Sequence, residues 1–243
     1  MEWNKNISNI HEIGGNKIIS KKHQKSIFLK REEFFYNLFG KNDLIKTPKI
    51  YRVGGLNLET YFIETEKKDF LQTAKDWAKV HSYYLENPIK ENKLTIQHDL
   101  CGVSLYILNN LDVFGNFVSI VRDKISDSKV NKNLKTILHG DLQQKNMVTF
   151  QGDNYYFDFE LGGIGHPARD IASMIISNPD NKEELLTTYK KYIDFYYSGL
   201  EEDVNNWLIA RTAQLYIIFD KRKGTKEQKR FIKEKLSKII NGQ

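Results

Sequence analysis

Four polar side chains stand at short, chemically suggestive spacings between residues 137 and 160. His139 and Asp141 are separated by one residue, and Asn146 follows the aspartate after five positions; twelve residues further on, Asp158 ends an apolar run. Phosphoryl transfer needs magnesium held by hard oxygen ligands and a carboxylate that aligns the acceptor hydroxyl. The pattern therefore predicts Asp141 as the catalytic base, with Asn146 and Asp158 holding the metal.

The spacing is specific. The chain has six histidines, so an accidental His-x-Asp-x4-Asn is expected only about 0.03 times. Apolar runs at Thr136–Leu138 and Met147–Phe150 flank the motif, which places its polar residues on a loop between two strands. The alternative interpretation is a polar β-turn with a structural histidine.

Three segments together carry a family resemblance: His139-Gly-Asp-Leu-x-x-x-Asn146, Asp158-Phe-Glu160 and Gly165-His-Pro-Ala-Arg-Asp-Ile-Ala172. They are similar to the aminoglycoside phosphotransferase and choline kinase-like group of small-molecule kinases, distant relatives of protein kinases. The resemblance implies that Asp170 supports the catalytic loop, to which His139 also belongs, without touching substrate. Gly140 stands where protein kinases have arginine, which favours the small-molecule branch.

Weaker similarities place nucleotide binding in the first 66 residues. The segment Phe28–Phe39 resembles the small-lobe helix whose glutamate orients the nucleotide lysine, which makes Glu32 the corresponding residue. Tyr61–Glu66 resembles the hinge between the lobes, where backbone groups around Glu64 and Glu66 would bind adenine.

The nucleotide lysine is less certain from the sequence. Lys21 and Lys22 both follow the strand-like Ile18-Ile19, and adjacent residues of a strand point to opposite faces, so only one of them can face a nucleotide. Lys30 is the third candidate, but it is too close to Glu32 to lie on a separate strand. We predict Lys21. A glycine-rich phosphate loop is not recognisable, since Gly14-Gly15 reads as a hairpin turn.

The pattern of apolar residues predicts an α+β, bilobal architecture, and the resemblance implies that this is a protein-kinase-like fold. Strand pairs at 7–23 and 49–63 enclose a helix at 26–39, which gives a small β-rich N-lobe over residues 1–65. Helical patterns at 74–85, 100–109, 113–125 and from 168 onward, with a strand-rich island at 135–159, give a mainly helical C-lobe over 66–243. The boundary is predicted near residues 64–68.

The composition fits a globular chain of 243 residues with a net charge of +6. Basic residues at 221–238 interleave with apolar ones at helical spacing, which indicates an amphipathic C-terminal helix with a solvated basic face rather than a nucleic-acid or membrane site. Cys101 is the only cysteine, so an internal disulfide is excluded. Because no apolar run is typical of a signal peptide or a membrane span, we expect a cytoplasmic monomer or homodimer.

The predicted reaction moves the γ-phosphate of Mg-ATP, or of GTP, to a small-molecule hydroxyl on an aminoglycoside, an amino-alcohol such as choline, or a sugar. Acids and aromatic residues gather between Asp180 and Trp207 and could bind a cationic amine, although we favour the interpretation as solvated faces of amphipathic helices. Two alternatives are a protein or peptide kinase and a catalytically silent nucleotide-binding module. The intact set of Asp141, Asn146 and Asp158 argues against the silent module.

Overall fold

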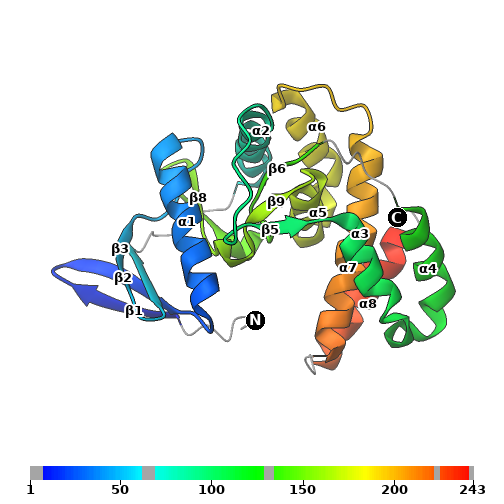
Figure 1. Cartoon of the computed structure of the whole chain (residues 1–243). Helices are drawn as coiled ribbons and strands as arrows, with labels where there is room; N and C mark the ends of the chain where they lie inside the picture. The colour runs from blue at the N-terminus through cyan, green and yellow to red at the C-terminus, as the bar shows by residue number, and fades with distance from the viewer. Residues whose placement is uncertain (1–7, 62–68, 129–133, 222–224, 241–243) are drawn as a thin grey trace.

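The computed structural model describes residues 8–61, 69–128, 134–221 and 225–240. The chain folds into a strand-rich N-terminal lobe and a mainly helical C-terminal lobe (Figure 1), as the sequence predicts. The predicted lobe boundary at 64–68, and with it Glu64 and Glu66 of the predicted hinge, lies outside the described residues.

The small lobe is built on one antiparallel sheet of order β1-β2-β4-β3. Gly14 and Gly15 turn the β1–β2 hairpin with φ of 57° and 79°, a left-handed backbone that glycine adopts without strain. The predicted strand pairs are confirmed. The strands are β1 (Ser8–Ile13), β2 (Asn16–Lys22), β3 (Ile50–Gly54) and β4 (Asn57–Tyr61).

Helix α1 (Ser26–Asn42) belongs to the small lobe by sequence but is fixed to the large lobe by contacts. The buried guanidinium of Arg31 donates to the carbonyl oxygens of Leu94 at 2.6 Å and Glu160 at 2.7 Å. The ring of Phe35 stacks on that of Phe159 with 5.8 Å between centroids. Figure 1 shows α1 lying between the sheet and the rest of the molecule.

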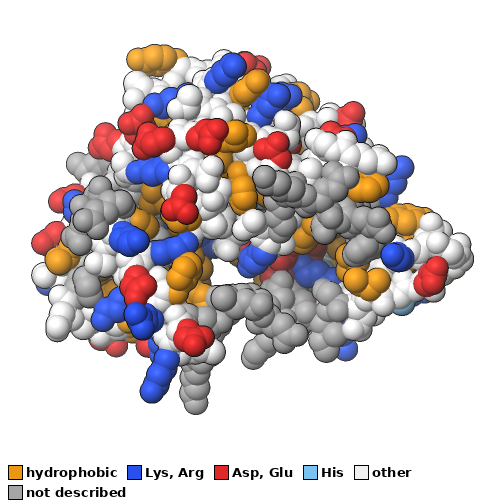
Figure 2. All heavy atoms as spheres, turned by 180° about the vertical axis from the view of Figure 1, so that it is seen from behind, with side chains coloured by type: hydrophobic (Ala, Val, Ile, Leu, Met, Phe, Trp, Pro, Cys, Tyr) orange, Lys and Arg blue, Asp and Glu red, His pale blue; other side chains and the backbone are white. Residues whose placement is uncertain are grey.

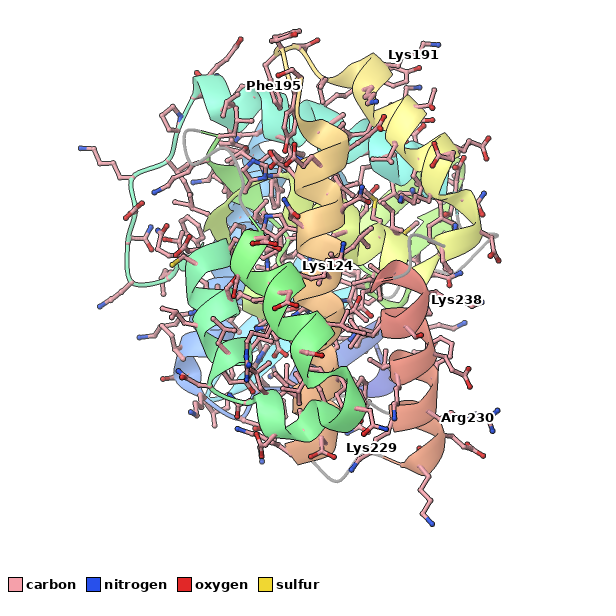
Figure 3. All side chains as sticks on the ribbon, turned by 90° about the vertical axis from the view of Figure 1, so that its right-hand side faces the viewer. Lys124, Lys191, Phe195, Lys229, Arg230 and Lys238 are labelled. Carbon is pink, nitrogen blue, oxygen red and sulfur yellow. The ribbon has the colours of Figure 1, made fainter. Side chains whose placement is uncertain are left out.

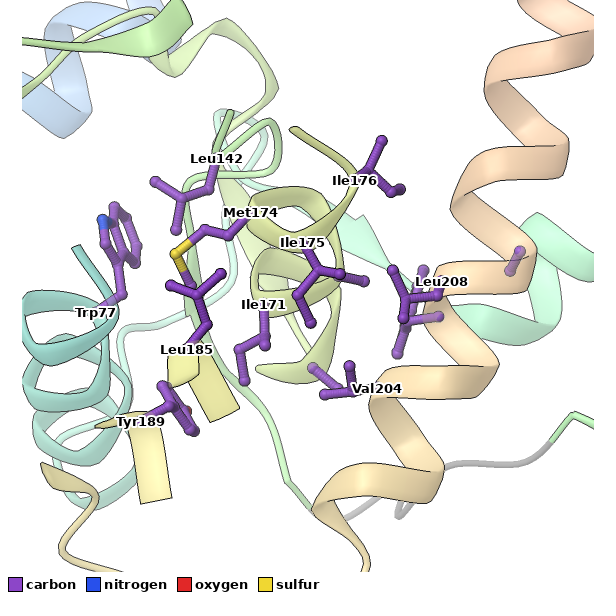
Figure 4. Packing of buried hydrophobic residues seen from close by; sticks show 14 of the residues in the cluster. Trp77, Leu142, Ile171, Met174, Ile175, Ile176, Leu185, Tyr189, Val204 and Leu208 are labelled. Carbon is purple, nitrogen blue, oxygen red and sulfur yellow. The ribbon is translucent and has the colours of Figure 1, made fainter. Parts of the chain in front are cut away.

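The large lobe packs around helix α5, whose residues from Ala168 to Ile176 are all buried. Its polar side chains Arg169, Asp170 and Ser173 are enclosed together with its apolar ones, so neighbouring elements cover the helix on every side. Figure 4 shows Ile171 and Ile175 of α5 between Leu185 on one neighbour and Val204 on another. The helices of this lobe are α2 (Phe70–Glu86), α3 (Leu100–Leu108), α4 (Val118–Asp127), α5 (Ala168–Ser177), α6 (Lys182–Tyr192), α7 (Leu200–Lys221) and α8 (Lys226–Ile240).

Short strands between the lobes position the polar motif. The sheet β5-β9-β6 and the hairpin β7-β8 lie on either side of residues 139–146. The strands are β5 (Ile96–His98), β6 (Thr136–Leu138), β7 (Met147–Phe150), β8 (Asp153–Tyr156) and β9 (Gly163–Gly165).

Two helices predicted in the large lobe, at 113–125 and at the C-terminal end, can be compared with the structure. The helix predicted at 113–125 is confirmed only from Val118, where α4 begins; before it, Gly115, with φ of 54°, kinks a 3₁₀ segment over Leu111–Phe117. The predicted basic C-terminal helix is present as α8, which buries Ile232 and Leu236. Figure 3 shows Arg230 and Lys238 on its outer side. Among the described residues, no helix is both long and apolar enough to cross a bilayer.

Candidate active site

The loop after β6 is held by the carboxylate of Asp170, which lies in α5 and is completely buried. Its two oxygens accept hydrogen bonds from the backbone N–H groups of His139 at 2.7 Å and Gly140 at 3.0 Å. A buried carboxylate that accepts two backbone donors fixes their position firmly. The structure therefore places Asp170 underneath the loop.

Gly140 is sterically required at the loop's turn. Its φ is 80°, and a Cβ built on it would lie 1.9 Å from the carbonyl oxygen of Leu161. No side chain, including the arginine of protein kinases, fits that space. Glycine at this position is therefore a packing requirement of this fold.

The ring of His139 links the loop to the strand that leads to Asp158. Its Nε2 lies 3.0 Å from the carbonyl oxygen of Phe157, and its Nδ1 accepts the backbone N–H of Asp141 at 3.4 Å. These partners select the tautomer that carries the proton on Nε2. Both ring nitrogens of His139 are thus engaged in contacts that tie the loop to the end of the β7–β8 hairpin.

Asp141 is surrounded by donors. Its Oδ1 accepts from Gln143 Nε2 at 2.6 Å and Arg211 Nη2 at 2.9 Å. Its Oδ2 lies 3.1 Å from both Lys145 Nζ and Asn146 Nδ2. Burial opposes the carboxylate charge, but Arg211 and Lys145 outweigh it and hold the pKa of Asp141 well below its usual range. Asp141 is therefore ionised and well oriented.

Asn146 and Asp158 lie beside each other at the start of the β7–β8 hairpin, where the N–H of Phe157 donates to the carbonyl oxygen of Asn146 at 3.1 Å. Asp158 adopts a left-handed backbone, with φ of 68°, which is uncommon for a residue other than glycine. Asp158 comes two residues after the end of β8. Because the side-chain nitrogen of Asn146 donates to Asp141, its oxygen is the atom that could ligate a cation.

Lys21, Glu32 and Asp158 meet across the lobes. Lys21 Nζ lies 2.8 Å from Glu32 Oε2 and 2.5 Å from Asp158 Oδ1. Burial alone would lower the pKa of Lys21, but the carboxylates of Glu32, Asp158 and Glu160 raise it above its usual value. Burial likewise opposes the charge of Glu32, yet Lys21 and His23 lower its pKa to about 2. Lys21 and Glu32 are therefore both charged.

The remaining candidates are placed elsewhere. Lys22 is exposed on β2 and Lys30 is exposed on α1, so neither reaches the cluster of Lys21, Glu32 and Asp158. The acids Glu183, Glu184, Glu201 and Glu202 are exposed on α6 and α7, and the interpretation as solvated helix faces fits them. Asp203 is buried, where it accepts from Tyr197 at 3.0 Å.

Three residues of the site were not predicted. His23 Nε2 lies 3.1 Å from Glu32, Lys145 contacts Asp141, and Arg211 reaches Asp141 from a point 70 residues away in the sequence. Lys145 sits inside the motif, so its spacing from Asp141 could have identified it. Arg211 lies within the long helix α7, and no local pattern in the sequence distinguishes it from a structural arginine.

Between the lobes the surface is hollowed, and Figure 2 shows acidic and basic side chains at the bottom of the hollow.

A family model described as the ecdysteroid kinase-like family matches residues 59–207, more than half of the chain. The chain belongs to the ecdysteroid kinase-like family. The match covers the loop of Asp141, Asn146 and Asp158, and it confirms the resemblance to kinase-like phosphotransferases. No curated protein sequence matches the chain.

Solved structures agree on the fold of this ecdysteroid kinase-like chain. One is aminoglycoside 2'-phosphotransferase-IIIa in its GDP complex, with 11% identity, a TM-score of 0.73, and coverage of 100% of this chain and 91% of that one. A second is a microcompartment-associated aminopropanol kinase, with 11% identity, a TM-score of 0.70, and coverage of 98% and 88%. A third is the amicoumacin kinase hAmiN with AMP-PNP and Ca²⁺, with 14% identity, a TM-score of 0.67, and coverage of 97% and 88%.

Proposed function

We propose that this protein transfers the γ-phosphate of ATP to a hydroxyl group of a small molecule, with a divalent cation, magnesium in the first place, as cofactor. One observation carries the proposal. The structure brings Asp141, Asn146, Asp158, Lys21 and Glu32 to one place from four separate parts of the sequence. The similar solved structures support it, since they are kinases and a phosphotransferase, one of them with a bound nucleotide analogue.

The residues present fit a nucleotide-bound cation better than an all-protein metal site. Among the described residues, no group of three or more His, Cys, Asp or Glu side chains could hold a metal alone. Asp158 and Asn146 offer hard oxygen ligands, and magnesium commonly completes its shell with phosphate oxygens and water. When bound, Mg-ATP supplies the phosphoryl group and neutralises its charge.

The chain's own side chains have separate tasks in this proposal. Asp141 accepts a hydrogen bond from the acceptor hydroxyl and so orients its oxygen toward the phosphate. Lys21, fixed by Glu32, presents its ammonium to the phosphates, and Asn146 and Asp158 would hold the cation. Because the pKa of Asp141 is low, we assign it mainly the task of orientation, with proton acceptance late in the step.

The proposal predicts that Asp141→Asn lowers kcat by roughly 10²–10⁴ while leaving the affinity for Mg-ATP nearly unchanged, because Asp141 acts on the acceptor and not on the nucleotide. ADP release with a panel of alcohols, sugars and amino-alcohols measures the first effect, and calorimetry measures the second. Wild-type turnover in Asp141→Asn would refute the assignment.

The matched prediction is that Asp158→Ala removes the magnesium dependence of nucleotide binding, since one hard oxygen ligand is lost. Asp153→Ala is the control, because Asp153 is an exposed carboxylate of the same hairpin that pairs with Lys46 at 3.1 Å. Calorimetry with ATP, with and without magnesium, compares the two variants. An unchanged magnesium effect in Asp158→Ala would place the cation elsewhere.

A further inference from the structure

Two arginines lie buried on the large-lobe side of the catalytic loop. Arg211 of α7 contacts Asp141, and Arg169 of α5 donates from Nη2 to the carbonyl oxygen of Gly140 at 3.3 Å. The exposed fraction is 4% for Arg211 and 3% for Arg169. The guanidinium of Arg169 also lies 5.3 Å from the ring centroid of Trp207, one helical turn before Arg211. The two guanidinium groups thus lie side by side against the loop at Gly140 and Asp141, and we call the surface they form the arginine wall.

Several N–H groups on this wall have no hydrogen-bond partner among the described residues. They are Nε and Nη1 of Arg169 and Nε of Arg211, all fully enclosed. Buried donors are costly to leave unsatisfied, and charged ones especially so. Since all three atoms are donors, a group that satisfies them must be an acceptor.

The electrostatic surroundings point the same way. Burial and then the nearby charge of Arg211 lower the pKa of Arg169 to about 9. Burial and then Arg169 lower the pKa of His98, on the adjoining strand β5, well below its usual value. Two guanidinium groups therefore lie behind Asp141, where Asp141 and Asp170 are the opposing carboxylates. Glu183, Glu184, Glu201 and Glu202 face solvent on α6 and α7 and do not reach this region.

We propose that Arg169 and Arg211 bind an anionic group of the substrate that accepts the phosphate. The substrate is then a hydroxy acid, or the corresponding compound with a phosphate in place of the carboxylate. This inference rests on the proposed function, because it names the substrate class of the same site. A planar guanidinium with unsatisfied donors suits a carboxylate or phosphate well.

The contact between Arg211 and Asp141 limits the length of the substrate. Their Nη2 and Oδ1 atoms are 2.9 Å apart, so a ligand that hydrogen-bonds to both must carry its hydroxyl and its anionic group close together. An α- or β-hydroxy acid, including a sugar acid, has this spacing. On binding, its anionic group replaces Asp141 as the partner of Arg211, which leaves Oδ1 for the hydroxyl.

The first test uses matched acceptors in an ADP-release assay. Glycerate, glyceramide and 3-amino-1,2-propanediol share a hydroxylated framework but carry a negative, a neutral and a positive group. Glucuronate, glucose and glucosamine form a second series. We expect kcat/KM to be about tenfold or more higher for the anionic member of a series. Preference for the neutral or cationic member, with turnover lost in Asp141→Asn, would overturn anion recognition while the phosphotransferase function stands.

The second test measures binding without turnover. By calorimetry, Asp141→Asn should bind glycerate or glucuronate more tightly than wild type, because the competing carboxylate of Asp141 is gone. Arg211→Gln and Arg169→Gln should weaken that binding by about 30-fold or more. Arg122→Gln, which removes an exposed arginine of α4, is the control. If neither anion binds, or if Arg211→Gln leaves binding unchanged, the subsite does not exist, whatever the enzyme's activity.

Because both arginines are buried, Arg169→Lys and Arg211→Lys accompany the glutamine variants and keep the positive charge. Circular dichroism and thermal melting establish that each variant is folded before binding is compared. A folded lysine variant should retain part of the anion affinity, since the charge remains but the paired donors are lost. Complete retention by both lysine and glutamine variants would contradict the proposal.

Discussion

At the scale of single residues, the pair formed by Lys21 and Glu32 shows how an ion pair stabilises the charged form of a buried carboxylate. Glu32 is 1% exposed, and it accepts from Lys21 at 2.8 Å and lies 3.1 Å from His23. Removing one partner of such a pair leaves an uncompensated buried charge, which costs far more than an exposed pair contributes. Glu32 should therefore contribute to the loss of stability of this protein at low pH, as should Asp141.

The pKa of Glu32 is lowered from 4.5 to about 2 in the folded protein. A lowered pKa stabilises the fold above the unfolded value and loses this effect as the pH falls toward 2. We therefore expect the free energy of unfolding of the wild type to fall between about pH 5 and pH 2 more steeply than that of Glu32→Gln. At pH 7, Glu32→Gln should be the less stable protein.

Denaturant unfolding at a series of pH values measures both effects. Glu33→Gln provides the control, because Glu33 is the next residue of the same helix and is only partly buried. Equal slopes for wild type and Glu32→Gln between pH 5 and pH 2 would show that Glu32 is not the responsible carboxylate.

The sequence identifies those candidate residues that can be recognised from their spacing along the chain. His139, Asp141 and Asn146 occupy one loop, and the alternation of a strand limited the nucleotide lysine to one of Lys21 and Lys22 without deciding between them. Arg211 and Arg169 were missed because their significance depends on the packing of α7 and α5 against the loop, which no local pattern encodes. The sequence likewise shows that Gly140 stands where protein kinases have arginine. It does not show why glycine is needed there, which is the closeness of the carbonyl oxygen of Leu161.

At the scale of elements, the catalytic loop is determined as much by what lies behind it as by its own residues. Asp170 fixes the two backbone N–H groups at its start, and the carbonyl oxygen of Leu161 closes the space beside Gly140. Periodicity alone also misled the helix prediction at 113–125. The segment has helical periodicity, but Gly115 interrupts it with a left-handed backbone. The short strands β5 and β9 were not predicted, because three residues carry too little periodicity.

Gly140→Ala is expected to abolish most activity and to destabilise the protein, because a Cβ would lie 1.9 Å from Leu161 O. Gly152→Ala is a closely matched control. Gly152 has the same φ of 80°, but a Cβ there would meet nothing within 4 Å. Left-handed strain alone costs about 1–2 kcal/mol, so that loss is expected in both variants.

The difference between the two variants isolates the steric contact. Thermal unfolding and ADP release should show a larger loss of stability and of turnover for Gly140→Ala than for Gly152→Ala. Equal losses in the two would mean that the loop can move away from Leu161 and that glycine at 140 is needed only for its backbone conformation.

At the scale of the whole molecule, α1 connects the lobes. Arg31 uses two donors on two separate carbonyl oxygens of the large lobe, and Phe35 stacks on Phe159. Replacing Arg31 by Met keeps much of the apolar stem but leaves Leu94 O and Glu160 O without this donor. We expect a loss of about 1–3 kcal/mol in the free energy of unfolding.

This change should lower the melting temperature by several degrees, at roughly 2–4 °C per kcal/mol for a chain of this size. Lys30→Met is the control, since Lys30 is the preceding residue and is exposed. Calorimetric melting compares the two variants. If Arg31→Met melts with the wild type, the contact between α1 and the large lobe does not depend on this arginine.

The anchoring of α1 also has a consequence for regulation. In protein kinases, activity is switched by moving the equivalent helix so that the Lys–Glu ion pair forms or breaks. Here the helix that carries Glu32 is attached to the same lobe as Asp158, so the ion pair with Lys21 and the contacts of α1 with that lobe are formed together. A movement of α1 that breaks the ion pair would also break the contacts of Arg31 and Phe35 with the large lobe. We therefore expect α1 to keep its position when acceptor and nucleotide bind.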